Sequence, residues 1–146
     1  MPAGKVLVYE PSVRVPLVLR GPGVPRGRVD DRLVANIDLA PTILDAANAK
    51  AGRRLDGRSL LVLLAKRSEG RRRDILLETP DYAAVRTTRY VYVEHTTGER
   101  ELYDLAVDPD ELQSRHDDPV FATIRADLER RLAKLRRCTG SACAMR

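Results

Sequence analysis

The chain has 146 residues and a formal net charge of +5, with 43% hydrophobic and 32% charged residues. This composition excludes a disordered polyelectrolyte and an integral membrane protein, because the longest apolar runs, such as Leu60–Ala65, are far shorter than the roughly 20 residues of a bilayer span. Aromatic residues make up only 4% and the charge is segregated into basic and acidic blocks, so no nucleic-acid partner and no membrane partner is predicted.

The first element predicted in the chain is a strand. Val15–Arg20 is a short continuous apolar run that ends at Gly21-Pro22, a pattern typical of a strand buried on both faces of a parallel sheet. Pro16 lacks a backbone N–H, so it is expected near the start of this strand or in a strand at the sheet edge. Upstream of it, Met1–Lys5 has no basic cluster followed by an apolar stretch, so no secretory signal peptide is predicted.

The second predicted element is a helix over Asn36–Ala49, whose apolar residues recur at helical spacing. Asp38 is a suitable N-cap, and Pro41 falls in the first turn, where its missing N–H is tolerated. One strand and one helix cannot form an α/β layer alone. We therefore interpret residues 1–73 as the end of a larger α/β domain, closed by a basic linker.

The second half of the chain, residues 74–146, predicts short strands followed by a helix. Ile75–Glu78 predicts a brief strand, and Ala83–Glu94 alternates with period two as one continuous pattern. Arg100–Leu105 can return as its partner strand after a turn at Thr97-Gly98. The predicted sheet is antiparallel, with about four strands.

A terminal helix is predicted from Pro119, with Asp118 as its cap. Its apolar face consists of Phe121, Ile124, Leu128, Leu132 and Leu135, which are spaced by three or four residues. We expect this helix to cover one face of the sheet. The predicted fold class is therefore α+β, with domains at 1–73 and 74–146: a strand–helix remnant of an α/β domain, then an antiparallel sheet packed by a terminal helix.

Cys138 and Cys143 are separated by four small or polar residues. A redox motif has only two intervening residues, which excludes that reading. The sequence favours a disulfide between the two cysteines, with two free thiols as the alternative. A disulfide would indicate secretion or another oxidising compartment.

The remaining polar residues form no complete catalytic constellation and no metal site. His95, at a strand end, and His116, in an acidic loop, are predicted to be surface histidines, and neither lies at zinc-ligand spacing. Asp104–Glu111 lacks the alternating ligands and central glycine of an EF-hand loop. No catalytic residue is therefore assigned within this chain.

Five segments in series resemble the sulfatase family. Gly4–Pro25 resembles the family segment in which Gly-Lys is followed by Tyr-Glu and an Arg-x-Pro strand. Asn36–Ala47 looks like the Asp-x-x-Pro-Thr helix, and Leu55–Leu60 like the loop after it. Ala84–Glu94 and Glu101–Leu112 resemble the C-terminal strands. The chain is identified as a C-terminal portion of the arylsulfatase-like branch of the alkaline-phosphatase superfamily.

The resemblance implies the final third of a sulfuric ester hydrolase. The family's formylglycine, made within a C/S-x-P-x-R motif, and its calcium ligands precede the Gly-Lys segment, and this chain has no such motif. The chain is expected to complete the fold and the substrate cleft, to hold no cofactor of its own and to be inactive alone. Its expected partner is the missing N-terminal portion or a second copy, and sulfate esters would be substrates of the intact enzyme only.

Lys5 is the one residue that matches a functional position of the family, the lysine that contacts the sulfate. An ammonium group there would stabilise the charge that develops on the sulfate oxygens in the transition state. Glu10 and Arg14 are interpreted as a structural pair. Two alternatives stay open: a freestanding binding module for acidic partners on a degraded sulfatase scaffold, and a hydrolase of the same superfamily that cleaves phosphonates, phosphodiesters or sulfamates.

Overall fold

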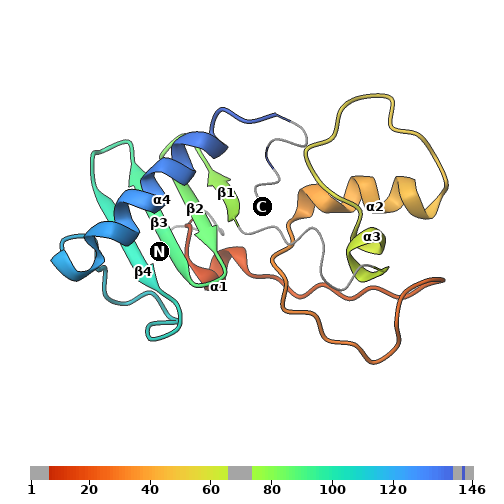
Figure 1. Cartoon of the computed structure of the whole chain (residues 1–146), viewed down its shortest axis with the longest axis horizontal. Helices are drawn as coiled ribbons and strands as arrows, with labels where there is room; N and C mark the ends of the chain where they lie inside the picture. The colour runs from red at the N-terminus through yellow and green to blue at the C-terminus, as the bar shows by residue number, and fades with distance from the viewer. Residues whose placement is uncertain (1–6, 66–73, 140–142, 144–146) are drawn as a thin grey trace. The chain divides into compact units, whose positions relative to one another are not determined.

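The computed structural model describes residues 7–65, 74–139 and 143 (Figure 1). Its elements are α1 (Glu10–Val13), the 3-10 turn η1 (Asn36–Asp38), α2 (Leu39–Ala46), α3 (Leu60–Ala65), β1 (Asp74–Glu78), β2 (Tyr82–Thr87), β3 (Tyr90–His95), β4 (Arg100–Asp104), η2 (Pro119–Phe121) and α4 (Ala122–Leu135). They form two compact units. The sheet unit combines the chain up to Leu17 with Leu76–Arg137, and the helical unit contains Val18–Ile75 and the residues after Arg137.

The sheet unit is built on a four-stranded sheet in the order β1-β2-β3-β4 (Figure 1). The register is antiparallel, with Val85 opposite Tyr92 in the β2–β3 pair and Val91 opposite Tyr103 in the β3–β4 pair. Gly98, in the predicted turn between β3 and β4, has a φ of 95°, which glycine adopts without strain. The structure therefore confirms the predicted α+β fold class with its C-terminal antiparallel sheet.

A turn at Thr88-Arg89 divides the predicted continuous pattern of Ala83–Glu94 into two strands. Thr87 stabilises this turn, because its Oγ1 accepts hydrogen bonds from the N–H groups of Arg89 (3.2 Å) and Tyr90 (2.8 Å). The continuous alternation was wrong across the turn: Val85 shares a face with Tyr92 and not with Val91. No glycine or proline marks this turn in the sequence.

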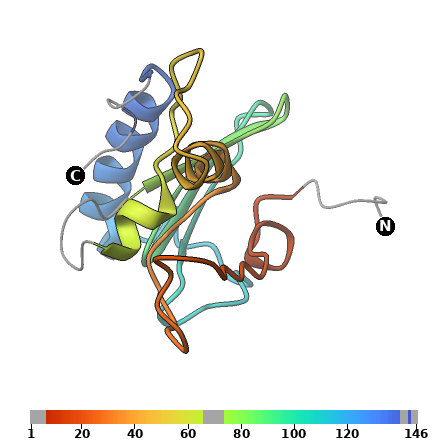
Figure 2. The ribbon, with the colours of Figure 1, turned by 90° about the vertical axis from the view of Figure 1, so that its right-hand side faces the viewer.

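Helix α4 covers one face of the sheet and packs on β2 and β3 (Figure 2). Leu128, Leu132 and Leu135 are at most 4% exposed, as the predicted apolar face requires. The Asp118 carboxylate accepts the N–H of Val120 at 3.0 Å, which confirms the predicted cap. Sheet and helix thus form one two-layer core.

The N-terminal segment Leu7–Val13 lies on the opposite face of the sheet from α4 (Figure 2). The segment and the sheet share an apolar cluster. The cluster consists of Val8, Tyr82, Ala84, Val91, Val93 and Tyr103, and the partly buried Tyr9, Leu77 and Leu105 pack against it. Val8 is only 2% exposed, so this segment is an integral part of the core. The domain limits at 1–73 and 74–146 stay a prediction, but the contacts join the first residues described to the C-terminal sheet.

Asp38 joins two loops of the helical unit. Its carboxylate is 2% exposed and accepts the N–H groups of Ala35 (2.9 Å) and Arg58 (2.8 Å). Thr42 Oγ1 donates to the Asp38 carbonyl at 2.5 Å and accepts the Leu60 N–H at 2.9 Å. Asp38 is the N-cap residue of α2, as predicted, but its carboxylate makes no capping hydrogen bond to that helix and binds the N–H groups of Ala35 and Arg58 instead.

Val15–Arg20 is extended chain outside any helix or strand, which corrects the predicted first strand. A buried strand needs hydrogen-bonded neighbours, and the sheet of the described residues contains only β1 to β4. Val15 and Val18 are instead 62% and 89% exposed. The helix predicted over Asn36–Ala49 is present as η1 and α2, and it ends at Ala46. None of the described helices has the length and apolarity to span a membrane.

Candidate functional site

The candidate site is the surface where the segment Leu7–Val13 meets strands β2, β3 and β4. This segment directly follows the Gly4-Lys5 pair on which the resemblance assigns a sulfate contact. Lys5 itself lies outside the described residues. The structure therefore shows how the chain after Lys5 is held, through two carboxylate-centred networks on the sheet.

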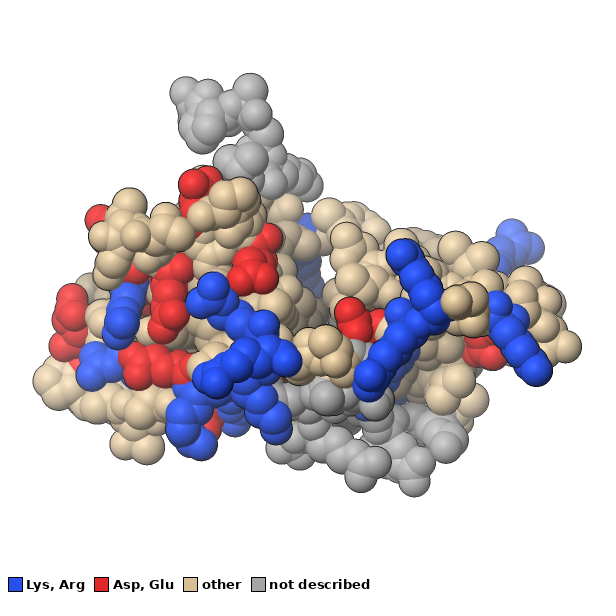
Figure 3. All heavy atoms as spheres, turned by 90° about the horizontal axis from the view of Figure 1, so that it is seen from above, with Lys and Arg blue, Asp and Glu red and all other residues tan. Residues whose placement is uncertain are grey.

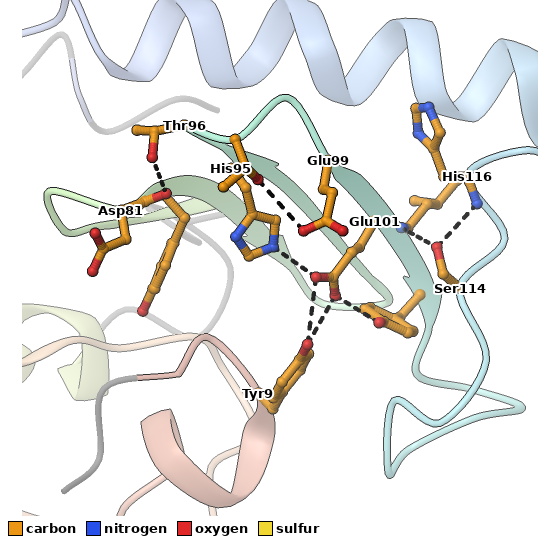
Figure 4. A network of polar contacts seen from close by, with 12 residues as sticks. Tyr9, Asp81, His95, Thr96, Glu99, Glu101, Ser114 and His116 are labelled. Atoms are coloured by element: carbon orange, nitrogen blue, oxygen red, sulfur yellow. Dashed lines mark hydrogen bonds and ion pairs between the residues drawn. The ribbon is translucent and has the colours of Figure 1, made fainter. Parts of the chain in front are cut away.

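Glu101 of β4 is the centre of the first network (Figure 4). Its Oε2 accepts hydrogen bonds from the hydroxyls of Tyr9 (3.1 Å) and Tyr103 (2.6 Å). His95 Nε2 lies 2.6 Å from its Oε1. Burial, and then the neighbouring Glu101 carboxylate, raise the pKa of Tyr9 and also that of Tyr103, so both phenols remain hydrogen-bond donors. Glu101 thus fixes the side chain of Tyr9 on the sheet.

The second network holds the next residue, Glu10. Its carboxylate Oε1 lies 2.7 Å from Arg86 Nε, and its backbone N–H donates to Glu111 Oε2 at 2.6 Å. Glu111 is 6% exposed, and burial raises the pKa of its carboxyl although the Glu10 N–H bond opposes this shift. Glu111 also has a φ of 54°, a left-handed conformation that costs a side-chain-bearing residue about 1–3 kcal/mol.

Glu10 therefore pairs with Arg86, and the predicted structural pair with Arg14 is wrong. Arg14 meets Glu10 only through the backbone, where its N–H donates to the Glu10 carbonyl at 2.8 Å and closes the single turn of α1. Arg86 is distant in sequence but lies on the β2 face that the N-terminal segment covers. The correction follows from a contact across 76 residues that local spacing cannot reveal.

The two histidines are half-buried, so their interpretation as surface histidines was wrong. The His95 side chain is 22% exposed and lies edge-on to the Tyr82 ring at a centroid distance of 6.0 Å. The His116 side chain is 17% exposed and its ring centroid lies 6.2 Å from that of Tyr92. Both rings are part of the packing around the sheet.

Acidic residues at the end of β4 and in the loop after it stabilise the fold through hydrogen bonds. Asp104 accepts two hydrogen bonds from Arg89, at 2.8 and 2.6 Å, which lower the pKa of its carboxyl. Asp108 accepts the N–H groups of Leu112 and Gln113. In the part of the chain that the structure describes, no group of three or more His, Cys, Asp or Glu residues could hold a metal ion. The site can therefore position a chain segment, and its described side chains offer no activated nucleophile.

Cys138 and Cys143 are joined by a disulfide, with their Cα atoms 5.0 Å apart. The link closes a short loop directly after α4. It lies in the helical unit and not in the sheet unit that contains the two carboxylate networks.

The sequence alone does not indicate a role for Glu101, Glu111 or Arg86. One local signal was available: Arg86 is a charged residue within the otherwise apolar run of β2, and such a residue needs a partner when its strand is covered. Glu111 gave no such signal, because its partner Glu10 is 101 residues away. Only the fold brings these groups together.

The protein family described as N-sulphoglucosamine sulphohydrolase, C-terminal, matches residues 4–138. The chain belongs to the sulfatase family. The match covers all five segments that carried the resemblance and confirms that this sulfatase-family chain corresponds to a C-terminal portion. Both carboxylate networks lie within the matched residues.

Known proteins agree with this assignment. Arylsulfatase K of Mus musculus is 34% identical over 124 residues, 74% of this chain and 22% of that protein. An extracellular sulfatase SULF-1 homolog of Drosophila melanogaster is 45% identical over 65 residues, 44% of this chain and 6% of that protein. The solved phosphonate monoester hydrolase from Silicibacter pomeroyi is similar with a TM-score of 0.79 at 27% identity, over 93% of this chain and 32% of that one. This sulfatase-family chain thus spans less than a quarter of the curated relatives named here.

Proposed function

We propose that this chain supplies the C-terminal portion of a sulfuric ester hydrolase, with Lys5 contacting the sulfate group of the substrate. The family match over residues 4–138, which includes the Gly4-Lys5 segment, carries this proposal. The two networks that hold Tyr9 and Glu10 on the sheet support it, because a substrate-binding lysine needs a fixed chain beside it.

The formylglycine and the calcium ion of the family do not fit this chain. It has no C/S-x-P-x-R motif, and its described residues offer no ligand set for a metal ion. We propose that both groups belong to an N-terminal sulfatase portion that assembles with this chain. The contribution of Lys5 would then be electrostatic stabilisation of the sulfate oxygens.

Activity is expected only when the two portions are assembled. The purified 146-residue chain should not hydrolyse p-nitrophenyl sulfate in the presence of calcium. In an enzyme assembled with an N-terminal sulfatase portion, Lys5→Ala should lower kcat about 100-fold, the loss typical for one transition-state contact. Lys50→Ala, a change at an exposed lysine, is the matched control and should leave kcat unchanged. Calcium-dependent turnover by the purified chain alone would refute the proposal.

A second candidate is hydrolysis of phosphonate monoesters. The similarity to the phosphonate monoester hydrolase, at a TM-score of 0.79, favours it. Both reactions place a tetrahedral anionic group beside a cation, so Lys5 would have the same role in each. Comparison of kcat/KM for an aryl sulfate and for an aryl phosphonate in the same assembled enzyme distinguishes the two candidates.

The alternative of a binding module for acidic partners has less support, because several cations of the sheet unit already have partners. Arg130 and Arg131 both pair with Asp127, at 2.7 and 2.6 Å, and Arg136 pairs with Glu78 at 3.1 Å. Figure 3 shows acidic and basic side chains interspersed over this unit. Such mixing favours pairing within the fold over a uniform cationic surface.

The proposed N-terminal portion has an apolar surface to cover on the helical unit. Ile37, Ile43 and Val62 are 48%, 66% and 50% exposed. Ile43 also lines an open apolar groove of about 380 Å³, together with other residues of α2 and residues within 51–55. An exposed apolar groove is typical of an interaction site. We propose that it packs against the rest of a sulfatase domain, and against a second copy when the chain is alone.

Self-association of the isolated chain should therefore depend on α2. Ile43→Lys should weaken it at least tenfold, because burial of one isoleucine contributes roughly 1.5–3 kcal/mol and about 1.4 kcal/mol is a factor of ten. Val120→Lys, at a residue of the sheet unit that is 84% exposed, is the control and should have no effect. Sedimentation over a concentration series measures both. A concentration-independent monomer would contradict this prediction.

The disulfide and the similarity to proteins named extracellular sulfatases support an oxidising, extracytoplasmic location for this chain. We propose this location together with the sulfatase function. Its physical basis is that a cross-link at the end of α4 persists only where thiols are not kept reduced.

A further inference from the structure

We infer that Glu111 is a positioning residue for the segment Leu7–Val13, which follows Lys5 in the sequence. Its buried carboxylate holds the backbone of Glu10 on the sheet, and so fixes the chain five residues after Lys5. This inference rests on the proposed role of Lys5, but the contact itself is visible within the described residues. The hydrogen bond of Glu111 is to the Glu10 N–H, so Glu111 would act on Lys5 through the main chain.

The geometry gives Glu111 this role because its contact is to the backbone. Glu111 Oε2 accepts the Glu10 N–H at 2.6 Å, and a hydrogen bond from an N–H group to a carboxylate is among the strong ones. The same Glu10 anchors its side chain on Arg86 Nε at 2.7 Å. Backbone and side chain of one residue are thus fixed from different directions, which determines the orientation of the segment as well as its position.

A second carboxylate acts on the preceding residue. Glu101 accepts the Tyr9 hydroxyl at 3.1 Å, and Figure 4 shows Tyr9 reaching from its segment toward the strand that carries Glu101. Val8 is buried against the same face of the sheet. Three consecutive residues are therefore held. Among the described side chains that bind Tyr9 and Glu10, Glu111 is the one that binds the main chain.

The backbone of Glu111 supports a specific role for its side chain. With a φ of 54°, Glu111 occupies the left-handed region that glycine enters freely and a glutamate enters at a cost. That conformation persists where surrounding contacts determine it. Here a local turn holds it: the Glu111 N–H donates to the Asp108 carbonyl at 3.2 Å, and the Asp108 carboxylate accepts the N–H groups of Leu112 and Gln113. The Glu111 carboxylate of this turn accepts the Glu10 N–H.

The carboxylate also provides a titration signal. The charged and titratable groups that face it are Tyr9, Glu10, Arg86 and Asp108. Its Oε1 and Arg86 Nη1 have no hydrogen-bond partner among the described residues. Burial raises the pKa of Glu111, so between the ordinary glutamate value and the raised value the folded chain binds a proton that the unfolded chain has lost. The contribution of this group to stability therefore falls as the pH rises through that window.

The test follows the Glu10 amide in the full 146-residue chain by NMR. Its proton resonance should shift with pH in a step above the ordinary glutamate range, and the amide should be protected from exchange. Glu111→Gln keeps an oxygen acceptor, so it should keep most of the protection and lose the pH step. Glu10→Gln should retain the step, which assigns it to Glu111.

Glu111→Gly separates the carboxylate from the backbone conformation, because glycine adopts a φ of 54° without strain. Protection of the Glu10 amide should fall at least tenfold in this variant, while the strand amides of Val85 and Tyr92 stay protected. Asp110→Gly, at the exposed neighbouring residue, is the matched control and should leave the Glu10 amide unchanged.

Unchanged protection of Glu10 in Glu111→Gly would overturn the inference, as would a pH step that survives Glu111→Gln. Both measurements are independent of catalysis. If Lys5→Ala had no effect in the assembled enzyme while the Glu10 amide behaved as expected, only the proposed sulfate contact would fail. The two failures are thus distinguishable.

Discussion

Replacing Gly57 with alanine is expected to unfold the helical unit. A Cβ atom at this position would overlap the Ile37 carbonyl oxygen and would lie 2.5 Å from the Ile37 carbonyl carbon and 2.9 Å from the Asp38 nitrogen. All three are backbone atoms, so no side-chain rotation can relieve the clash. The loop at Gly57 would have to move away from η1, which would break the Arg58 N–H bond to Asp38. We expect a loss of about 3 kcal/mol or more, as for severe overpacking.

Amide exchange across residues 35–65 measures this effect, because it reports the helical unit separately from the sheet unit. Gly52→Ala is the matched control: an added Cβ at Gly52 meets no atom within 4 Å, and a surface change of this kind stays within about 0.5 kcal/mol. Equal protection in Gly57→Ala and Gly52→Ala would show that the close approach to Ile37 is not required.

Replacing Leu132 with alanine is expected to destabilise the sheet unit by about 2–5 kcal/mol, the range for leucine truncation in a packed core. Leu132 is 1% exposed on the face of α4 that packs against β2 and β3. Alanine keeps the helical backbone, since it has the highest helix propensity. The loss therefore measures side-chain packing between helix and sheet.

Urea unfolding, followed by the tyrosine signals of the sheet, tests this prediction. Val120→Ala removes an apolar side chain that is 84% exposed beside the same helix, and it should change the free energy of unfolding by less than about 0.5 kcal/mol. A Leu132→Ala midpoint that coincides with the Val120→Ala midpoint would mean that α4 does not stabilise the sheet.

The sequence predicted those parts of the fold that depend on local signals. The Asp118 cap, the apolar face of α4 and the Gly98 turn all rest on residues within a few positions of one another. The Thr88-Arg89 turn was missed because it contains no glycine or proline. The Thr87 hydroxyl stabilises it by accepting the Tyr90 N–H. Val15–Arg20 was predicted as a strand because its composition fits one, although the described sheet offers it no neighbour.

The candidate site depends on distant partners, so sequence analysis could identify its N-terminal segment but not its supports. The resemblance identified Lys5 and Glu10 through their motif. It could not identify Arg86, Glu101 or Glu111 as their supports, because these residues are more than 75 positions away.

Two of the resemblance segments, Asn36–Ala47 and Leu55–Leu60, form one contact in the structure. Asp38 and Thr42 of the first segment bind the backbone N–H groups of Arg58 and Leu60 in the second. The Asp and Thr of the Asp-x-x-Pro-Thr motif therefore join the two segments through hydrogen bonds.

The order of the elements along the chain has a consequence for biosynthesis. Strands β2, β3 and β4 pair with their sequence neighbours, so their hairpins can form as soon as they leave the ribosome. The Glu10 backbone, in contrast, meets a partner made 101 residues later, which at ordinary elongation rates is a delay of about 5–20 s. During that interval Val8 and Tyr9 lack the surface that covers them in the finished fold. A ribosome stalled within α4 would thus present the segment Leu7–Val13 undocked, to chaperones or to proteases.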